Sequence, residues 1–211
     1  MVDATMLVMN NGTHLFVAYD ATGDITEDLD DTSSIGFDTG NDEVFTDGGD
    51  DQFMLSEGVM GGSMHFAYDE ALGGYDVDCQ PFDDTLPGHA GLAGAVGFGP
   101  SDLSVLDHRM YEYAIPLALI DAAAGDVLGF MGGSFFWPGV YDSDIDWWAN
   151  WPVPVPFWAT LQDFGDLVLS NLPVTTVTLD GTAGLNGWFI SDVTVTLTAT
   201  GGQGGVDYTR Y

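Results

Sequence analysis

The sequence predicts an all-β protein, an antiparallel β-sandwich followed by a short C-terminal β-hairpin segment of an Ig-like domain. Three observations lead to this fold class. Only five of the 33 acidic residues are Glu, and Asp favours turns over helices. Apolar and polar residues alternate along short stretches, as they do in half-buried strands. Turn residues separate these stretches about every 8–12 residues, and no helical periodicity is seen.

The first half of the chain contains several strand-like stretches. Residues 5–24 predict two strands joined at Asn11-Gly12, a dipeptide that favours the tight turn of a hairpin. Further short strands are expected within residues 33–40, 51–58 and 62–70.

The second half continues the same pattern. Residues 89–99 are rich in Gly but lack the G-x-G-x-x-G register of a dinucleotide site, so they predict a closely packed strand or loop. Residues 108–120 begin with an alternation that Pro116 ends, because proline cannot donate to a strand ladder. A helical turn and a buried strand are expected within residues 121–133, and residues 164–170 predict the last strand of this domain.

The segment Asn171-Leu172-Pro173 separates two predicted domains, residues 1–172 and residues 173–211. Beyond it, Thr alternates strictly with Val or Leu. The alternation places an apolar row on one face: Val177, Leu179, Val193, Val195, Leu197 and Ala199. Such a row needs a cover, which could be further chain, the sandwich of the same chain, or a neighbouring copy joined by strand addition into a filament.

The charge excludes several functions. The net charge is −31 and the chain has no Lys, so it would repel nucleic acids and anionic membranes. No apolar run approaches the roughly 18 residues of a membrane span, and no signal peptide is seen, so a secreted form would be mature or a fragment. The single Cys79 excludes an intrachain disulfide and a cysteine-rich metal site.

Two acidic segments are candidate calcium sites. The first offers oxygen ligands interspersed with Gly in one loop: Asp38, Asn41, Asp42, Asp47, Asp50 and Asp51. The second offers Asp142, Asp144 and Asp146 on one side of an extended chain. Calcium prefers carboxylate and carbonyl oxygens, and crowded carboxylates repel one another unless a cation lies between them. The alternative for both segments is a solvated acidic surface.

Aromatic residues crowd the segment 135–158 and form a candidate ligand site: Trp137, Tyr141, Trp147, Trp148 and Trp151. Sugar rings stack on exposed aromatic faces, but the same rings could instead plug the end of the sandwich or bury a protein contact. Asn11-Gly12-Thr13 is a glycosylation sequon that coincides with the predicted turn.

No catalytic motif is present. The chain lacks G-x-S-x-G, H-E-x-x-H and P-loop patterns, and it has no lysine nucleophile. The sequence therefore favours binding over catalysis.

Two parts of the chain resemble known families. The stretches "NGTHLFVAYDATGD", "SIGFDTGND" and "DGGDDQF" resemble the opening of carbohydrate-binding family 9-like modules, relatives of the DOMON fold. "HRMYEYAIPL", "GDVLGF" and "FGDLVL" are similar to later strands of that fold, so the resemblance covers about residues 5–170. The tail from "TVTLDG" onward is similar to the first half of an OmpL47-like, Ig-like surface repeat.

These resemblances imply a non-catalytic, extracellular or cell-surface module that binds a polysaccharide or surface glycan, often with structural calcium. The alternative is a structural subunit that binds copies of itself through the C-terminal segment. A distant third function is haem b binding, as in some DOMON relatives. Its ligands would come from the eight Met or from His14, His65, His89 and His108, but no C-x-x-C-H motif is present.

Overall fold

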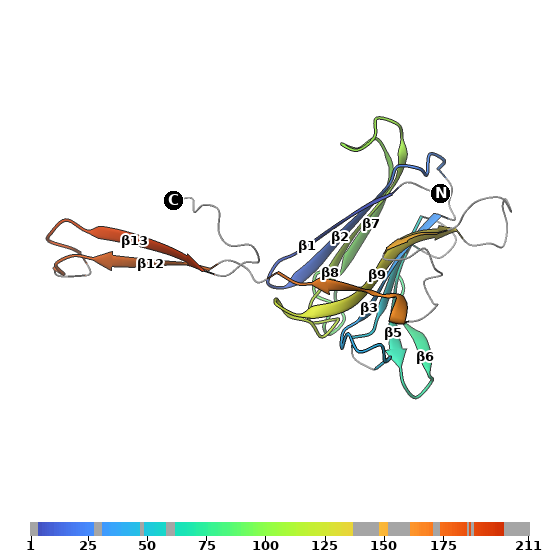
Figure 1. Cartoon of the computed structure of the whole chain (residues 1–211), viewed down its shortest axis with the longest axis horizontal. Coiled ribbons are helices and arrows are strands. Elements are labelled where there is room, and N and C mark those ends of the chain that lie inside the picture. Colours follow the sequence, from blue (N-terminus) through green and yellow to red (C-terminus); the bar gives the residue numbers. More distant parts are fainter. Residues whose placement is uncertain are drawn as a thin grey trace. The chain divides into compact units, whose positions relative to one another are not determined.

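This computed structural model describes residues 4–27, 31–46, 49–57, 62–136, 148–151, 161–170, 174–184, 186 and 188–200. The chain forms two compact units, Met1–Leu169 and Ser170–Tyr211 (Figure 1). The first unit holds two antiparallel sheets, and the second holds a two-stranded hairpin. The predicted all-β fold class is confirmed.

One sheet of the first unit has four strands. In spatial order they are β1 (Thr5–Asn10), β2 (His14–Ala21), β8 (His108–Pro116) and β7 (Ala93–Gly99). The predicted hairpin between β1 and β2 is confirmed, since these strands pair in continuous register. The Asn11 side-chain oxygen accepts hydrogen bonds from the backbone N–H groups of Thr13 and His14 at 2.9 and 2.8 Å, which fixes the turn.

The other sheet has seven strands. In spatial order they are β10 (Trp148–Trp151), β9 (Val127–Phe136), β3 (Asp31–Asp38), β4 (Gln52–Ser56), β5 (Ser63–Asp69) and β6 (Gly74–Cys79), and β11 (Gly165–Val168) also pairs with β9. Strands β6 and β10 were not expected from the sequence. The residues before β9 form hydrogen-bonded turns rather than the expected helical turn.

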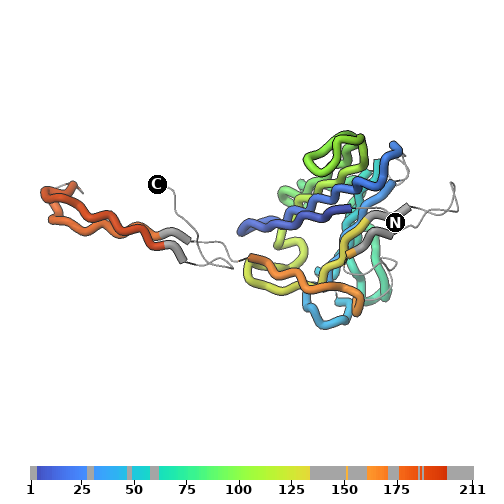
Figure 2. The backbone as a smooth tube through the Cα atoms, turned by 45° about the horizontal axis from the view of Figure 1, so that its top comes forward, coloured from blue at the N-terminus to red at the C-terminus, as the bar shows by residue number. Residues whose placement is uncertain are grey.

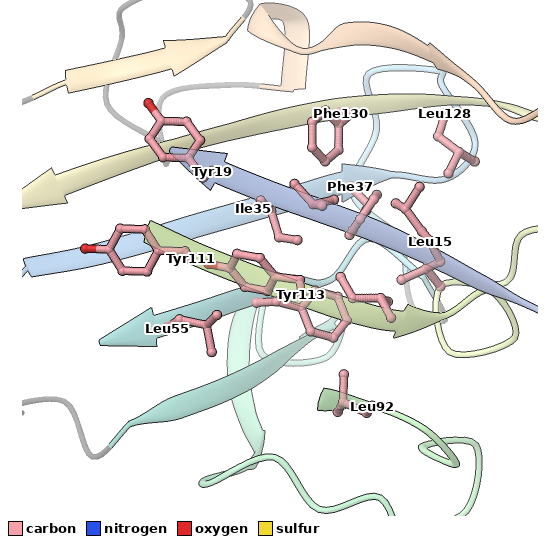
Figure 3. Packing of buried hydrophobic residues seen from close by; sticks show 14 of the residues in the cluster. Leu15, Tyr19, Ile35, Phe37, Leu55, Leu92, Tyr111, Tyr113, Leu128 and Phe130 are labelled. Carbon is pink, nitrogen blue, oxygen red and sulfur yellow. The ribbon is translucent and has the colours of Figure 1, made fainter. Parts of the chain in front are cut away.

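The core lies between the two sheets of the first unit. Figure 3 shows side chains of β2 and β8 pointing toward those of β3 and β9. The fully buried members include Leu15, Ile35, Phe37, Tyr113, Ile115, Leu128 and Phe130. The Phe37 and Phe130 rings are 5.5 Å apart. Along β2 of the smaller sheet the alternation separates a buried face from a partly exposed one, whereas β3 in the middle of the larger sheet is buried along its whole length.

A buried ion pair links the two sheets. Arg109 of β8 donates two hydrogen bonds to one carboxylate oxygen of Asp31 of β3, at 3.3 and 3.2 Å. Arg109 also donates to Glu57, and its guanidinium lies over the Phe98 ring. The Arg109 side chain is fully buried, so these acceptors replace its hydration shell.

Residues 80–92 connect β6, at the edge of the larger sheet, with β7, at the edge of the smaller one. This crossover is anchored by Leu92, which is buried in the core, and by Phe82 and Leu86, which pack against it. Gly88 and Gly91 have φ values of +85° and +88° and flank His89. The two glycines allow the tight turns that bring His89 close to His65 of β5 and Asp78 of β6.

The second unit is the hairpin of β12 (Val174–Asp180) and β13 (Thr194–Thr200), which Figure 2 shows running side by side. The strands pair antiparallel from Val174↔Thr200 to Asp180↔Thr194. The short 3-10 turn η1 (Leu161–Asp163) belongs to the first unit and precedes β11. Within the described residues, no helix has the length and apolar character needed to cross a bilayer.

Candidate functional site

The first acidic segment forms a loop held by its own carboxylates. Asp50 is fully buried, and its two carboxylate oxygens accept hydrogen bonds from the backbone N–H and hydroxyl groups of Thr39 and Thr46 at 2.6–3.2 Å. Asp38 accepts from the backbone N–H groups of Asp42 and Glu43 at 3.3 and 2.9 Å. These contacts account for the burial of two acids without a bound ion.

The remaining predicted calcium ligands are dispersed. Asn41 donates to Asp166 at 3.1 Å, and Asp42 accepts from the backbone N–H of Val44 at 3.0 Å. Asp51 points to His65 of β5, with 2.9 Å between its carboxylate oxygen and His65 Nε2. Calcium binding by this loop stays a prediction.

Substitution of Asp38 tests whether this loop holds a cation. Burial raises the pKa of Asp38 above its ordinary 3.8, against the lowering effect of the backbone N–H groups of Glu43 and Asp42. Because the folded state then binds this proton more tightly than the unfolded chain, stability falls as the pH rises from 3.8 through the folded pKa. In chelated buffer the wild type is therefore expected to lose stability over this pH range, and Asp38→Asn should lack this part of the pH dependence.

The same melts are run with millimolar calcium and with sodium chloride at matched ionic strength. A calcium-specific rise in the wild type that Asp38→Asn abolishes would establish a calcium site. An Asp38→Asn variant with the same pH dependence as the wild type would contradict the expected cost of burying this carboxylate.

Several predicted residues lie outside the described part of the chain. They are Asp47, Asp142, Asp144, Asp146, Trp137, Tyr141 and Trp147, together with the side chain of Trp148. Trp151 is described: it is 42% exposed at the end of β10, and its ring lies 6.1 Å from that of Phe130. Asn11 is exposed, as a glycosylation site requires, although its side chain also holds the turn.

The four histidines lie in three environments. His14 stacks on Phe16, with ring centroids 5.9 Å apart. His108 is fully buried, with Nε2 2.6 Å from an Asp20 carboxylate oxygen and Nδ1 2.6 Å from the Leu106 carbonyl. His65 and His89 lie together, with 3.3 Å between His65 Nδ1 and His89 Nε2.

His65 and His89 belong to a buried cluster that the sequence did not indicate. Asp78 and Cys79, at the end of β6, complete it. One donor atom from each of the four residues lies within 4.8 Å of all the others. The residues come from three segments: β5, β6 and the crossover. Elsewhere in the described ranges, no group of three or more His, Cys, Asp or Glu side chains converges in this way.

A β-bulge explains how two consecutive residues reach the same place. His65 pairs with Cys79 and Phe66 pairs with Val77, so Asp78 is the extra residue on β6. In a regular strand Asp78 and Cys79 would point to opposite faces, whereas a bulge re-aims the extra side chain. The Asp78 carboxylate lies 3.0 Å from His65 Nδ1 and 2.7 Å from His89 Nε2.

The cluster is held from outside by fixed partners. The His89 Nδ1 lies 3.1 Å from the Pro87 carbonyl, which can only accept a hydrogen bond. The His65 ring stacks on the buried Phe53 ring at 4.5 Å. Burial raises the pKa of the Cys79 thiol, although backbone hydrogen bonds from Asp83 and His65 act in the opposite direction.

The apolar row of the C-terminal hairpin is also where the alternation predicts it. Val177 lies opposite Leu197, and Leu179 lies opposite Val195. These four side chains are 37–60% exposed. At the end of the hairpin, Trp188 and Ile190 are 77% and 74% exposed. An apolar surface of this kind is typical of a contact with another protein surface.

Comparison of the chain with protein-family models and with curated proteins finds no match. The resemblance to carbohydrate-binding family 9-like and OmpL47-like domains therefore remains an expectation, and any function must be argued from the chain's own residues.

Proposed function

We propose that this chain is a non-catalytic β-sandwich module of an extracellular or cell-surface assembly, which binds neighbouring copies of itself through its C-terminal hairpin. The observation that carries the proposal is the exposed apolar row of Val177, Leu179, Val195 and Leu197. A two-stranded hairpin is at best marginally stable in water, and a further sheet packed on this row would supply the missing apolar contact.

The charge distribution supports the same surface. Copies carrying a net charge of −31 repel one another, so a stable contact between them has to be poor in charge. Asp180, at the end of β12, is the one charged residue in the sequences of β12 and β13. The hairpin therefore offers a segment on which two copies can approach without bringing carboxylates together.

Charged substitutions on the two faces of the hairpin provide a matched test. Leu179→Asp with Val195→Asp places two charges in the apolar row, whereas Thr178→Asp with Thr196→Asp places the same two charges in the neighbouring pair on the opposite face. Light scattering after size-exclusion chromatography measures the mass of each variant.

We expect the wild type and the threonine variant to form multimers whose mass rises with concentration, and the Leu179/Val195 variant to be monomeric. Deletion of residues 174–211 should also give a folded monomer. A monomeric wild type at all concentrations, or equal behaviour of the two variants, would contradict assembly through this face.

Glycan binding is a second candidate function, favoured by the exposed Trp151 ring at the end of β10. A glycan array should then show binding that Trp151→Ala removes. Binding that survives this substitution would place the sugar elsewhere, and no binding to any glycan would leave assembly as the supported function.

A further inference from the structure

Two imidazole rings and a carboxylate meet in the buried cluster, and when both rings are neutral their tautomers leave no hydrogen between the three groups. The Pro87 carbonyl fixes a proton on His89 Nδ1, and the Asp51 carboxylate accepts from His65 Nε2 at 2.9 Å. With those nitrogens protonated, a neutral ring presents a lone pair from its other nitrogen. His65 Nδ1 and His89 Nε2 then both direct lone pairs at the same Asp78 oxygen.

Lone pairs at these separations repel one another unless a positive charge lies among them. The Asp78 oxygen lies 2.7 Å from His89 Nε2 and 3.0 Å from His65 Nδ1, and the two nitrogens are 3.3 Å apart. The side chains of His65 and His89 are only 2% and 5% exposed, so water screens this repulsion little. Arg109 does not supply this charge, because its guanidinium is paired with Asp31 and Glu57, and Arg210 lies outside the described residues.

We propose that His65 Nδ1, His89 Nε2, the Asp78 carboxylate and the Cys79 sulfur bind one divalent transition-metal ion of the zinc class. Imidazole and thiolate are ligands of zinc and its neighbours, whereas calcium takes oxygen ligands. Four donors of mixed N, S and O type complete the tetrahedral shell of a structural zinc site. None of these four ligands belongs to the acidic loop considered above for calcium or to the hairpin proposed for assembly, although Asp51 of that loop contacts His65.

The spacing of the three nitrogen and oxygen donors fits such an ion, and the Cys79 donor atom lies within 4.8 Å of each of them. In a tetrahedral zinc site with bonds of 2.0–2.1 Å, neighbouring N and O ligands lie about 3.3 Å apart. The two imidazole nitrogens are at this separation, and the Asp78 oxygen is a few tenths of an ångström closer to each. An ion 2.0–2.1 Å from all three atoms would lie about 1 Å out of their plane.

Charge balance favours a divalent ion in this place. The Asp78 carboxylate and a Cys79 thiolate together neutralise its two charges, and the imidazoles are neutral ligands. The ion and its four ligands would carry no net charge, which lowers the desolvation cost of burying an ion, and the buried Asp51 carboxylate beside His65 would add one negative charge. The Asp78 side chain is 37% exposed, whereas the other ligands are almost fully buried, so an ion would enter from the Asp78 side.

The outer contacts match those of metal-binding histidines. Ligating imidazoles usually donate their second N–H to a carboxylate or a backbone carbonyl, which fixes the ring. Asp51 provides this contact for His65, and Pro87 provides it for His89. An ion here would join the β5–β6 edge to the crossover that leads to the other sheet.

Titration of the intact, chelator-treated chain with zinc and cobalt tests the proposal. We expect one ion per chain, a higher melting temperature with zinc, and no comparable effect of calcium at the same concentration. Cobalt should give a tetrahedral spectrum with a thiolate charge-transfer band. Cys79→Ser should remove that band, whereas His14→Gln, a histidine outside the cluster, should leave it unchanged.

Two substitutions on β6 distinguish direct binding of the metal by Asp78 from nonspecific attraction of the ion to the acidic surface. Asp78→Asn should weaken zinc binding, and Asp76→Asn, which removes the same charge two residues earlier on β6, should leave it nearly unchanged. Asp51→Asn should weaken binding about 10- to 100-fold by releasing the His65 ring. These affinities are measured by calorimetric titration on variants whose fold is checked by circular dichroism.

The proposal is overturned if zinc fails to bind the folded wild type. In that case protonated imidazoles paired with Asp51 and Asp78 hold the cluster together. It is also overturned if cobalt binds with an octahedral, sulfur-free spectrum, or if Asp76→Asn weakens binding as much as Asp78→Asn does, because the ion would then belong to the acidic surface.

Discussion

Replacing Arg109 with alanine is expected to lower the free energy of unfolding by about 3–5 kcal/mol, because it leaves the Asp31 carboxylate buried without the guanidinium that balances its charge. The Arg109 and Asp31 side chains are 0% and 2% exposed, so water cannot replace the lost partner. Chemical denaturation at pH 7 measures the change.

Two controls separate the buried pair from ordinary surface charge. Glu57→Gln removes a partner that is 40% exposed and should cost less than about 1 kcal/mol. Arg109→Met combined with Asp31→Leu removes both charges and should recover most of the lost stability. An Arg109→Ala variant within about 1 kcal/mol of the wild type would show that the cross-sheet pair contributes little.

Replacing Phe53 with alanine is expected to have two effects. It should lower the free energy of unfolding by about 3–5 kcal/mol, and it should weaken zinc binding. Phe53 is fully buried, its ring packs edge-on against Phe37 at 5.9 Å, and its face stacks on His65. Removing the ring leaves a cavity and frees one proposed metal ligand.

Phe37→Ala is the matched control, because it removes an equally buried ring that is not in stacking contact with His65 in the described structure. Both variants should lose similar stability in thermal and denaturant unfolding. In the milder pair, Phe53→Leu and Phe37→Leu, zinc affinity should fall in the first variant only. An equal loss of affinity in both would mean that general loosening, not support of the His65 ring, weakens the site.

The fold was predictable where local chemistry decides it. Asn11-Gly12 marks its hairpin because the Asn11 side chain bonds the turn, and Pro116 marks the end of β8 because it has no N–H. The alternation in residues 174–180 and 194–200 gives both strands of the C-terminal hairpin and the face that carries the apolar row.

The proposed metal centre was not predictable, because tertiary structure creates it. Strand β6 begins after Gly73 and carries Asp76 and Asp78, which are typical of an acidic turn. The bulge that turns Asp78 toward His65 has no signature in the sequence. His89 reaches the cluster from a crossover, and a single cysteine gives no metal-binding spacing.

In the acidic loop the sequence suggested a shared ion site, whereas the fold gives its carboxylates separate partners. Asp38, Asp50 and Asp51 stand close in sequence and suggested a common ion, but each carboxylate has a different partner in the fold. Asp often bonds the backbone of its own turn, and composition alone cannot separate that role from ion binding. Asp51 was therefore singled out from the sequence, while its contact with His65 was not.

X-ray absorption at the zinc edge, on the intact chain loaded with one equivalent of zinc, tests the proposed centre most directly. We predict one sulfur neighbour at about 2.3 Å and three nitrogen or oxygen neighbours at about 2.0–2.1 Å, with the outer scattering of two imidazole rings. Loss of the sulfur shell in Cys79→Ser would assign it. A spectrum with nitrogen and oxygen neighbours only, or with six oxygen neighbours, would contradict a centre built from His65, Asp78, Cys79 and His89.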